Sequence, residues 1–234
     1  ARAHGLPLTI VMIFDISAGA DMLISRAEFK RITDLKGARV GFEKGAVGEL
    51  LLNEILNLAE LKKTDIKPIE LTIDKQLEAW QSNQIDAMVT YEPVASQLQS
   101  LGGFKLFDSR EIPNTIVDVL AIRSDVLNFS HANAIRHLVA AHFHALNYIN
   151  KNPQDAAYRM ATHLGLPVVD VLPAFKGLVL PDANYNHRLM TGTSAELLLS
   201  AKRLVKSMLK NGLLKKHDPL NTLINKDYLP RDIA

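Results

Sequence analysis

Short apolar segments alternate with helix-like segments through the first 120 residues, and this alternation restricts the fold more than any other feature. The first of them, Leu8 to Phe14, is β-branched and almost wholly apolar, which is typical of a strand buried on both faces. We expect further strands at residues 22–25, 39–42, 66–71, 86–90, 104–107 and 117–123, and helices at about 43–61 and 74–82. The pattern predicts an α/β fold with a parallel sheet and right-handed crossovers.

The second half of the chain is almost entirely helical in pattern from His131 onward. Asp74 is expected to cap the helix at 74–82, and Asn152 to cap a helix that begins at Pro153. Residues 193–196 have the form of a capping box, and Gly212 is expected to end the helix that follows it. No repeat or low-complexity linker marks a boundary between the two halves.

The composition excludes several classes of site. There is no cysteine, so disulfides, thiolate metal sites and a cysteine nucleophile are ruled out. The 27 basic and 25 acidic residues give a net charge of +2, which makes no electrostatic case for nucleic acid or an anionic membrane as partner. No apolar run approaches the roughly 20 residues of a membrane-spanning helix. The chain begins at Ala1 without methionine or a signal peptide, so we expect a processed or truncated product, which fits export.

Histidine and lysine patterns give no catalytic or metal motif. His142 and His144 are two residues apart and point to different faces of a helix, so solvated histidines are expected. No His-Glu-x-x-His or Gly-x-Ser-x-Gly motif is present. The basic residues Lys202, Arg203, Lys206 and Lys210 have no interleaved aromatic residues, which favours a solvated helix face over a nucleic-acid surface. We therefore predict no enzyme activity, no metal and no cofactor.

A small-residue turn between a strand and a helix is the first candidate binding site. Gly45, Ala46 and Val47 lie at the expected start of a helix, where free backbone N–H groups and the helix dipole favour an anion. The alternative is a tight connection that binds nothing. The spacing matches neither a Walker loop nor a complete dinucleotide-binding fingerprint.

Two further candidates also follow predicted strands. Ser17, Ala18 and Gly19 form a polar, small-residue turn where open α/β sheets bind ligands; the alternative is an ordinary surface turn. Tyr91 could stack on a ligand and Glu92 could pair with an amine. Their alternative is that Tyr91 packs and Glu92 caps the helix after Pro93.

Three segments taken together resemble a known family. They are residues 5–21, then 32–41, which contain D-L-K-G-x-x-V-G, and 85–93, which contain D-A-x-V-T-x-E-P. The chain resembles the substrate-binding proteins of nitrate, sulfonate and taurine ABC importers, a group also called SsuA/THI5-like or NMT1-like. The tail at 211–230 is similar as well.

The resemblance implies a two-lobed type II periplasmic-binding-protein fold with the ligand between the lobes. Lobe one would comprise residues 1–21 and 114–234, and lobe two residues 22–113. In this family a further α/β unit precedes the position of Ala1, so lobe one is expected to lack its first N-terminal unit and to expose apolar surface. Ser17–Gly19, Gly45–Val47, Tyr91 and Glu92 would all face the cleft, and lobe closure would bury the ligand.

The function implied is that of the solute-binding component of an ABC importer, located in the periplasm or otherwise outside the cytoplasm. The expected partners are permease subunits and a small anionic or zwitterionic ligand, such as a sulfonate, taurine or a thiamin pyrimidine. The N–H groups of Ala46 and Val47 would hold its negative end and Glu92 a positive end. The alternatives are a ligand-sensing domain of a signalling protein and an NMT1/THI5-like pyrimidine-biosynthesis protein, whose cysteine-rich iron motif is absent here.

Overall fold

The computed structural model describes residues 1–231 and divides them into two compact units, each with its own core. Unit 1 comprises residues 1–16, 117–173 and 179–231, and unit 2 comprises residues 17–116 and 174–178. The predicted lobe boundaries at residues 21 and 114 lie within a few residues of two of these divisions. The return of residues 174–178 to unit 2 was not foreseen.

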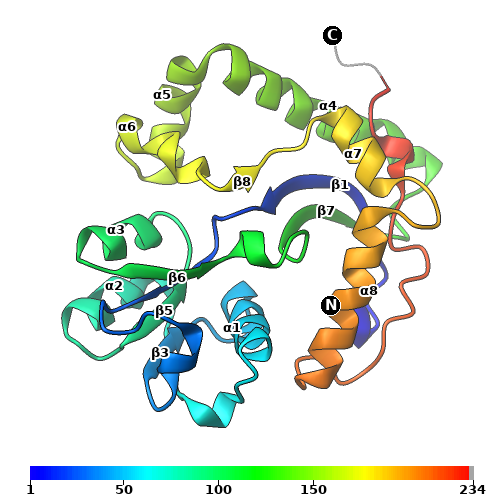
Figure 1. The fold of residues 1–234 in the computed structure, drawn as a ribbon. Coiled ribbons are helices and arrows are strands. Elements are labelled where there is room, and N and C mark those ends of the chain that lie inside the picture. Colours follow the sequence, from blue (N-terminus) through cyan, green and yellow to red (C-terminus); the bar gives the residue numbers. More distant parts are fainter. Residues whose placement is uncertain (232–234) are drawn as a thin grey trace. The chain divides into compact units, whose positions relative to one another are not determined.

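Unit 2 is built on a five-stranded sheet with the order β4-β3-β5-β2-β6 (Figure 1). Its strands are β2 (Met22–Ser25), β3 (Arg39–Phe42), β4 (Lys67–Glu70), β5 (Ala87–Thr90) and β6 (Phe104–Asp108). Its helices are α1 (Val47–Leu58), α2 (Ile73–Gln81) and α3 (Val94–Ser100), with short 3₁₀ turns at Ile32–Leu35, Lys63–Asp65 and Ser109–Glu111.

Alternate residues of these strands enter two separate cores. Leu23 and Val89 point to the face that packs against Leu52 and Ile55 of α1. Met22, Ile24 and Met88 point to the opposite face, which α2 and α3 cover with side chains that include Trp80 and Leu98. The pleat of the strands therefore gives unit 2 three layers, because every second side chain lies on each face.

The parallel sheet that the sequence predicts is only partly present. β3 pairs in parallel with both β4 and β5, and in each case a helix makes the connection. β2 pairs antiparallel with β5 and β6, so the prediction is wrong at this end of the sheet. Two parallel strands must be joined by a crossover connection, usually a helix. No such connection leads from β2 directly to β5 or β6.

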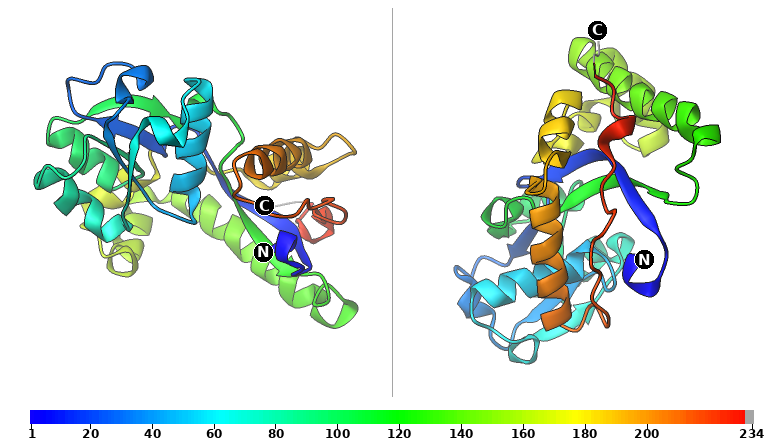
Figure 2. Two further views of the ribbon diagram at one scale, coloured as in Figure 1. Left: turned by 90° about the horizontal axis from the view of Figure 1, so that it is seen from below. Right: turned by 90° about the vertical axis from the view of Figure 1, so that its right-hand side faces the viewer.

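Unit 1 contains the three-stranded sheet β7-β1-β8, formed by β7 (Val117–Arg123), β1 (Leu8–Ser17) and β8 (Leu178–Val179). Its helices are α4 (Phe129–Lys151), α5 (Pro153–Leu164), α6 (Val168–Val171), α7 (Ala183–Met190) and α8 (Glu196–Lys210), with 3₁₀ turns at Arg2–His4, Pro173–Phe175 and Lys226–Tyr228. The long α4 runs beside the sheet (Figure 2) and packs Val139 and Phe143 against it.

β1 is three residues longer than predicted and is held by a side chain from far along the chain. The fully buried Asn186 on α7 accepts a hydrogen bond from the Ile13 N–H at 2.7 Å and donates one to the Ile13 carbonyl oxygen at 3.2 Å. β1 pairs antiparallel with β7 and has irregularities between Ile10 and Met12 and between Ile13 and Asp15. These leave backbone groups that the Asn186 amide satisfies.

Several predicted helix caps are wrong in detail. The helix expected to begin at Asp74 begins one residue earlier, and the Asp74 carboxylate instead accepts a hydrogen bond from the Thr72 hydroxyl. α8 begins at Glu196 with no side-chain cap, so residues 193–196 form no capping box. Asn152 precedes Pro153 at the N-cap position, but its side chain makes no capping bond. Gly212 follows the end of α8 with a φ of 72°, as predicted.

Not all the helical histidines are solvated. The ring of His142 makes edge-to-face contacts with Phe14 and Phe143, at centroid distances of 5.1 and 5.2 Å. Its Nε2 atom is buried and bonds to none of the described residues. Burial lowers the pKa of His142, because the charged ring is poorly solvated there.

We predict that His142 makes the stability of the chain depend on pH. Below the unfolded-state pKa of about 6.5 the unfolded chain takes up a proton that folded His142 refuses, so the free energy of unfolding falls as the pH is lowered through that value. His142→Leu should reduce this slope in urea unfolding between pH 7 and pH 5, whereas His144→Gln, at an exposed neighbour, should leave it unchanged. Equal slopes in all three proteins would contradict the assignment.

Candidate functional site

One edge of the unit 2 sheet gathers residues from four strands. The register pairs Met22 of β2 with Thr90 of β5 and with Asp108 of β6, while β3 and β5 run in parallel. The segments that begin at Glu43 and Tyr91 and the residue Asp21 therefore meet at this edge. The Ser109 N–H donates to the Asp21 carbonyl oxygen at 2.9 Å, which brings the segment after β6 to the same edge.

The helix start at residues 45–47 lies on this edge and presents backbone donors. Gly45 has a φ of 73°, and its N–H donates to the Glu49 carboxylate at 3.0 Å. Ala46 is the N-cap of α1 and offers no side-chain cap. Among residues 1–231, no group accepts a hydrogen bond from the N–H groups of Ala46 and Val47. Both residues are exposed, so these two donors are open to an external acceptor.

Glu49 sets the charge at this helix start. Burial disfavours its charged form, but hydrogen bonds from the Lys63 ammonium at 2.8 Å and from the Gly45 N–H lower the pKa of Glu49. The carboxylate therefore stays ionised and occupies the N–H of Gly45, the residue before the N-cap. The N–H groups of Ala46 and Val47 stay open to an anion.

The turn at residues 17–19 is closed by bonds within unit 2. The buried Ser17 hydroxyl and the Gly19 N–H each lie 2.7 Å from the Ser109 hydroxyl oxygen. The Ala18 N–H donates to the Gly177 carbonyl oxygen at 2.7 Å. These polar groups are satisfied by the protein itself, which supports a structural role for the turn beside the open donors of α1.

Tyr91 and Glu92 have different surroundings at the end of β5. Tyr91 is 40% exposed, and its pKa is raised by partial burial and by the negative charges of Glu43 and Asp21. Glu92 accepts hydrogen bonds from the Ser96 N–H at 3.1 Å and the Ser96 hydroxyl at 2.9 Å, so both its oxygens bind the first turn of α3. The structure thus shows the capping role that was the alternative for Glu92, and its pairing with an amine stays a prediction.

A cationic group that the sequence reasoning missed lies beside the turn. The Arg110 guanidinium donates to the buried Asp108 carboxylate at 2.8 and 2.5 Å, and the Lys105 ammonium donates to the same carboxylate at 2.6 Å. Hydrogen bonds from Arg110 hold the pKa of Asp108 well below its usual range. Arg110 remains largely exposed, and its Nε would lie 3.3 Å from a Cβ built on Gly19.

At this end of the edge Arg110 and Lys105 both bond to the Asp108 carboxylate, and the charge of Glu111 also acts on Arg110. The surroundings of Tyr91 are acidic, with Glu43 and Asp21 both acting on its pKa. Such an arrangement suits a small molecule with charges of both signs. The sequence held a signal for Arg110, because it follows the strand predicted at 104–107 in the same way that the other candidates follow theirs.

Metal ligands are not gathered at this edge. Within residues 1–231 no group of three or more His, Cys, Asp or Glu side chains is placed to hold a metal ion. Nor does any helix of that part of the chain combine the length and apolar character needed to span a membrane.

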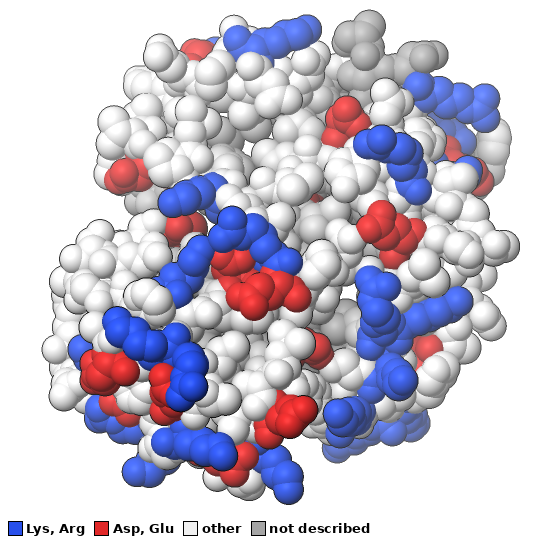
Figure 3. All heavy atoms as spheres, viewed as in Figure 1, with Lys and Arg blue, Asp and Glu red and all other residues white. Residues whose placement is uncertain are grey.

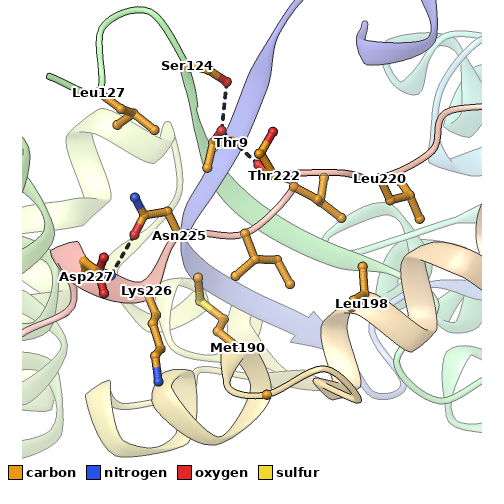
Figure 4. Close-up of a pocket in the computed structure, with 13 residues that line it drawn as sticks. Thr9, Ser124, Leu127, Met190, Leu198, Leu220, Thr222, Asn225, Lys226 and Asp227 are labelled. Atoms are coloured by element: carbon orange, nitrogen blue, oxygen red, sulfur yellow. Dashed lines mark hydrogen bonds between the residues drawn. The ribbon is translucent and has the colours of Figure 1, made fainter.

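A groove of about 580 Å³ lies in unit 1, and none of the predicted site residues lines it (Figure 4). Its floor is partly apolar, with Met190 and Leu198 among the lining residues. Its hydroxyl groups bond to the protein: Thr9 and Ser124 lie 2.8 Å apart, and Thr9 also donates to the Thr222 carbonyl oxygen.

We predict that Gly177→Ala disrupts the turn beside the site. Gly177 has a φ of 82°, and a Cβ there would lie 2.5 Å from backbone atoms of Gly19 and Ala20, so the turn would have to move. We expect a loss of about 2–4 kcal/mol in the free energy of unfolding. Gly102→Ala is the matched control: its φ is 84° but nothing lies within 4 Å, so a loss of only about 1 kcal/mol is expected. Equal urea midpoints for the two variants would contradict this contact.

Comparison with known proteins places the chain in a family. A family model described as NMT1/THI5 like matches residues 1–156. An aliphatic sulfonates-binding protein of Escherichia coli K12 is 32% identical over 126 residues, which are 53% of this chain and 40% of that protein. The chain thus spans less than half of this curated relative.

Solved structures show the same fold. The periplasmic aliphatic sulphonate-binding protein SsuA of Escherichia coli superposes with a TM-score of 0.77 at 22% identity, over 96% of this chain and 75% of that one. The desulfurization enzyme DSZB superposes with a TM-score of 0.67 at 17% identity, over 96% and 78% of the two chains. The type II periplasmic-binding-protein fold predicted from the resemblance is confirmed, and the family model, which covers two thirds of the sequence, shows that the chain belongs to the NMT1/THI5-like family.

Proposed function

We propose that the chain is the ligand-binding part of a solute-binding protein of an ABC importer, and that its ligand is a small zwitterionic or anionic sulfonate. The observation that carries the proposal is the meeting, at one edge of unit 2, of open N–H donors at Ala46 and Val47 with Tyr91 and its acidic neighbours. The relative from Escherichia coli is named as a sulfonates-binding protein, which supports the ligand class.

In this proposal each end of the ligand is recognised by a different group. The sulfonate oxygens accept hydrogen bonds from the N–H groups of Ala46 and Val47, where the dipole of α1 adds its positive end. The exposed Tyr91 ring contacts the organic part of the ligand. An amine is favoured over a bare inorganic anion, because Glu43 and Asp21 supply negative charge beside Tyr91.

The partner of such a protein is an importer permease, and the compartment is the periplasm or another space outside the cytoplasm, as for the periplasmic protein of the same fold. A chemical step is not part of the proposal, although DSZB shows that this fold also supports an enzyme. The chain has no cysteine, Glu92 is bonded to the first turn of α3, Arg110 is paired with Asp108, and the pKa of Tyr91 is above its ordinary value.

A thermal-shift and calorimetric screen tests the ligand class. Taurine and short alkanesulfonates are expected to raise the melting temperature, whereas nitrate, bicarbonate and thiamin pyrimidines are expected to have smaller effects. Ligand at a hundred times its dissociation constant stabilises the folded state by about 2.7 kcal/mol. Tight binding of nitrate without binding of any sulfonate would sink the proposed ligand class.

Val47→Pro tests the helix-start donors without removing the helix. Val47 is the first residue of α1, a position that favours proline, and Ala46 has the extended backbone (φ −120°, ψ −173°) that a residue before proline adopts. The variant loses the Val47 N–H, so sulfonate affinity should fall about ten- to a hundredfold, as for a lost hydrogen bond to a charged acceptor. Val47→Ala keeps the N–H and is the control. Equal sulfonate affinity of the two variants would contradict a ligand contact at the start of α1, whatever the result of the ligand screen.

A further inference from the structure

The outward face of α8 and the segment after it carry an unusual concentration of positive charge. Residues 196–217 contain six basic residues and one acidic residue, Glu196. We call the six the α8 basic face; they are Lys202, Arg203, Lys206, Lys210, Lys215 and Lys216, and all are exposed. Figure 3 shows Lys and Arg side chains gathered over α8, whose place is given in Figure 1.

Helical spacing puts the first four of these residues on one side of α8. They follow Leu199 at intervals of three, four, seven and eleven residues, so the five side chains form one stripe along the helix. Leu199 itself is 40% exposed and lies at the N-terminal end of this stripe. The other side of α8 is buried through Leu197 and Val205, which fixes the basic side outward.

The positive charge of this face is not neutralised by the protein. None of the six basic side chains is in an ion pair found among the described residues. Arg203 donates to the Ser200 hydroxyl at 2.7 Å, which leaves its charge unpaired. The lysines carry no ion pair with any described residue. The charges therefore act together on whatever approaches the helix.

The small net charge of the whole chain does not reveal the positive charge concentrated in residues 196–217. Without residues 196–217 the sequence has 21 basic and 24 acidic residues, so this one segment converts a net negative chain into a net positive one. The net charge of the whole chain gives no reason to expect binding to an anionic membrane. The local charge of residues 196–217 does give one, because salt screens electrostatic interactions beyond about 10 Å, so that only nearby charges matter.

We propose that the α8 basic face binds to an anionic phospholipid surface. Five of its six basic residues are lysines, which act as point charges and demand no particular geometry from their partner. Four of the six project from a helix about 22 Å long rather than line a pocket, as suits a flat and laterally mobile layer of headgroups. Leu199 adds an apolar contact at the N-terminal end of the stripe. The face contains none of the aromatic residues that stack on bases in nucleic-acid sites.

Co-sedimentation of the whole chain with vesicles tests this proposal. We expect binding to vesicles of equimolar phosphatidylcholine and phosphatidylglycerol, weakening as salt is added, and no binding to phosphatidylcholine alone. Each lysine near an anionic membrane contributes about a fivefold gain in affinity, so the triple variant K202Q/K206Q/K210Q should bind about a hundredfold more weakly.

The matched control is the triple variant K36Q/K67Q/K151Q, which removes the same charge from exposed lysines elsewhere that form no ion pair with a described residue. It should bind within about twofold of the unmodified chain. Circular dichroism and melting temperature verify that each variant is folded. The proposal is overturned if the unmodified chain ignores anionic vesicles, if the control loses as much affinity as the α8 variant, or if duplex DNA binds more tightly than vesicles at equal phosphate concentration.

Discussion

The parallel pairing of β3 with β5 is the constraint on which the candidate site depends. Two parallel strands side by side must end at the same edge of their sheet, so the segments that follow Phe42 and Thr90 are brought together whatever their own residues are. The antiparallel β2 then begins where β5 ends, which adds Asp21 to the same edge. The pairing of the strands therefore determines which segments meet at the site, independently of their side chains.

Much of this could be predicted from the sequence, because apolar periodicity reports which elements form. The strands at 22–25, 39–42 and 117–123 and the helix at the Gly45–Val47 turn are found where the pattern predicts them. The pattern does not report which strands pair, so the antiparallel position of β2 was missed. It also does not report hydrogen bonds between distant segments, and for that reason the bonds of Ser109 to the turn at Ser17 were not foreseen.

The net charge read from the sequence likewise does not tell where the charged side chains lie in the fold. A net charge of +2 describes a nearly neutral chain. The fold collects opposite charges into pairs around Asp108 and leaves one helix almost purely basic. Glu92 is a related case, since a carboxylate that the motif offers to a ligand is bonded to the helix that it precedes. Position on an element decides the role of each charged group.

The hydrogen bond between Ala18 and Gly177 has a consequence for the order of synthesis. Unit 2 consists of residues 17–116 and a short piece from 174–178, so the ribosome must make the whole of α4 and α5 before the turn can close. Unit 1 can be completed only later in synthesis, because the backbone of Ile10 bonds to Leu223 and Asn225. A nascent chain thus acquires neither complete unit until translation is well advanced, and contacts so distant in sequence make folding slow.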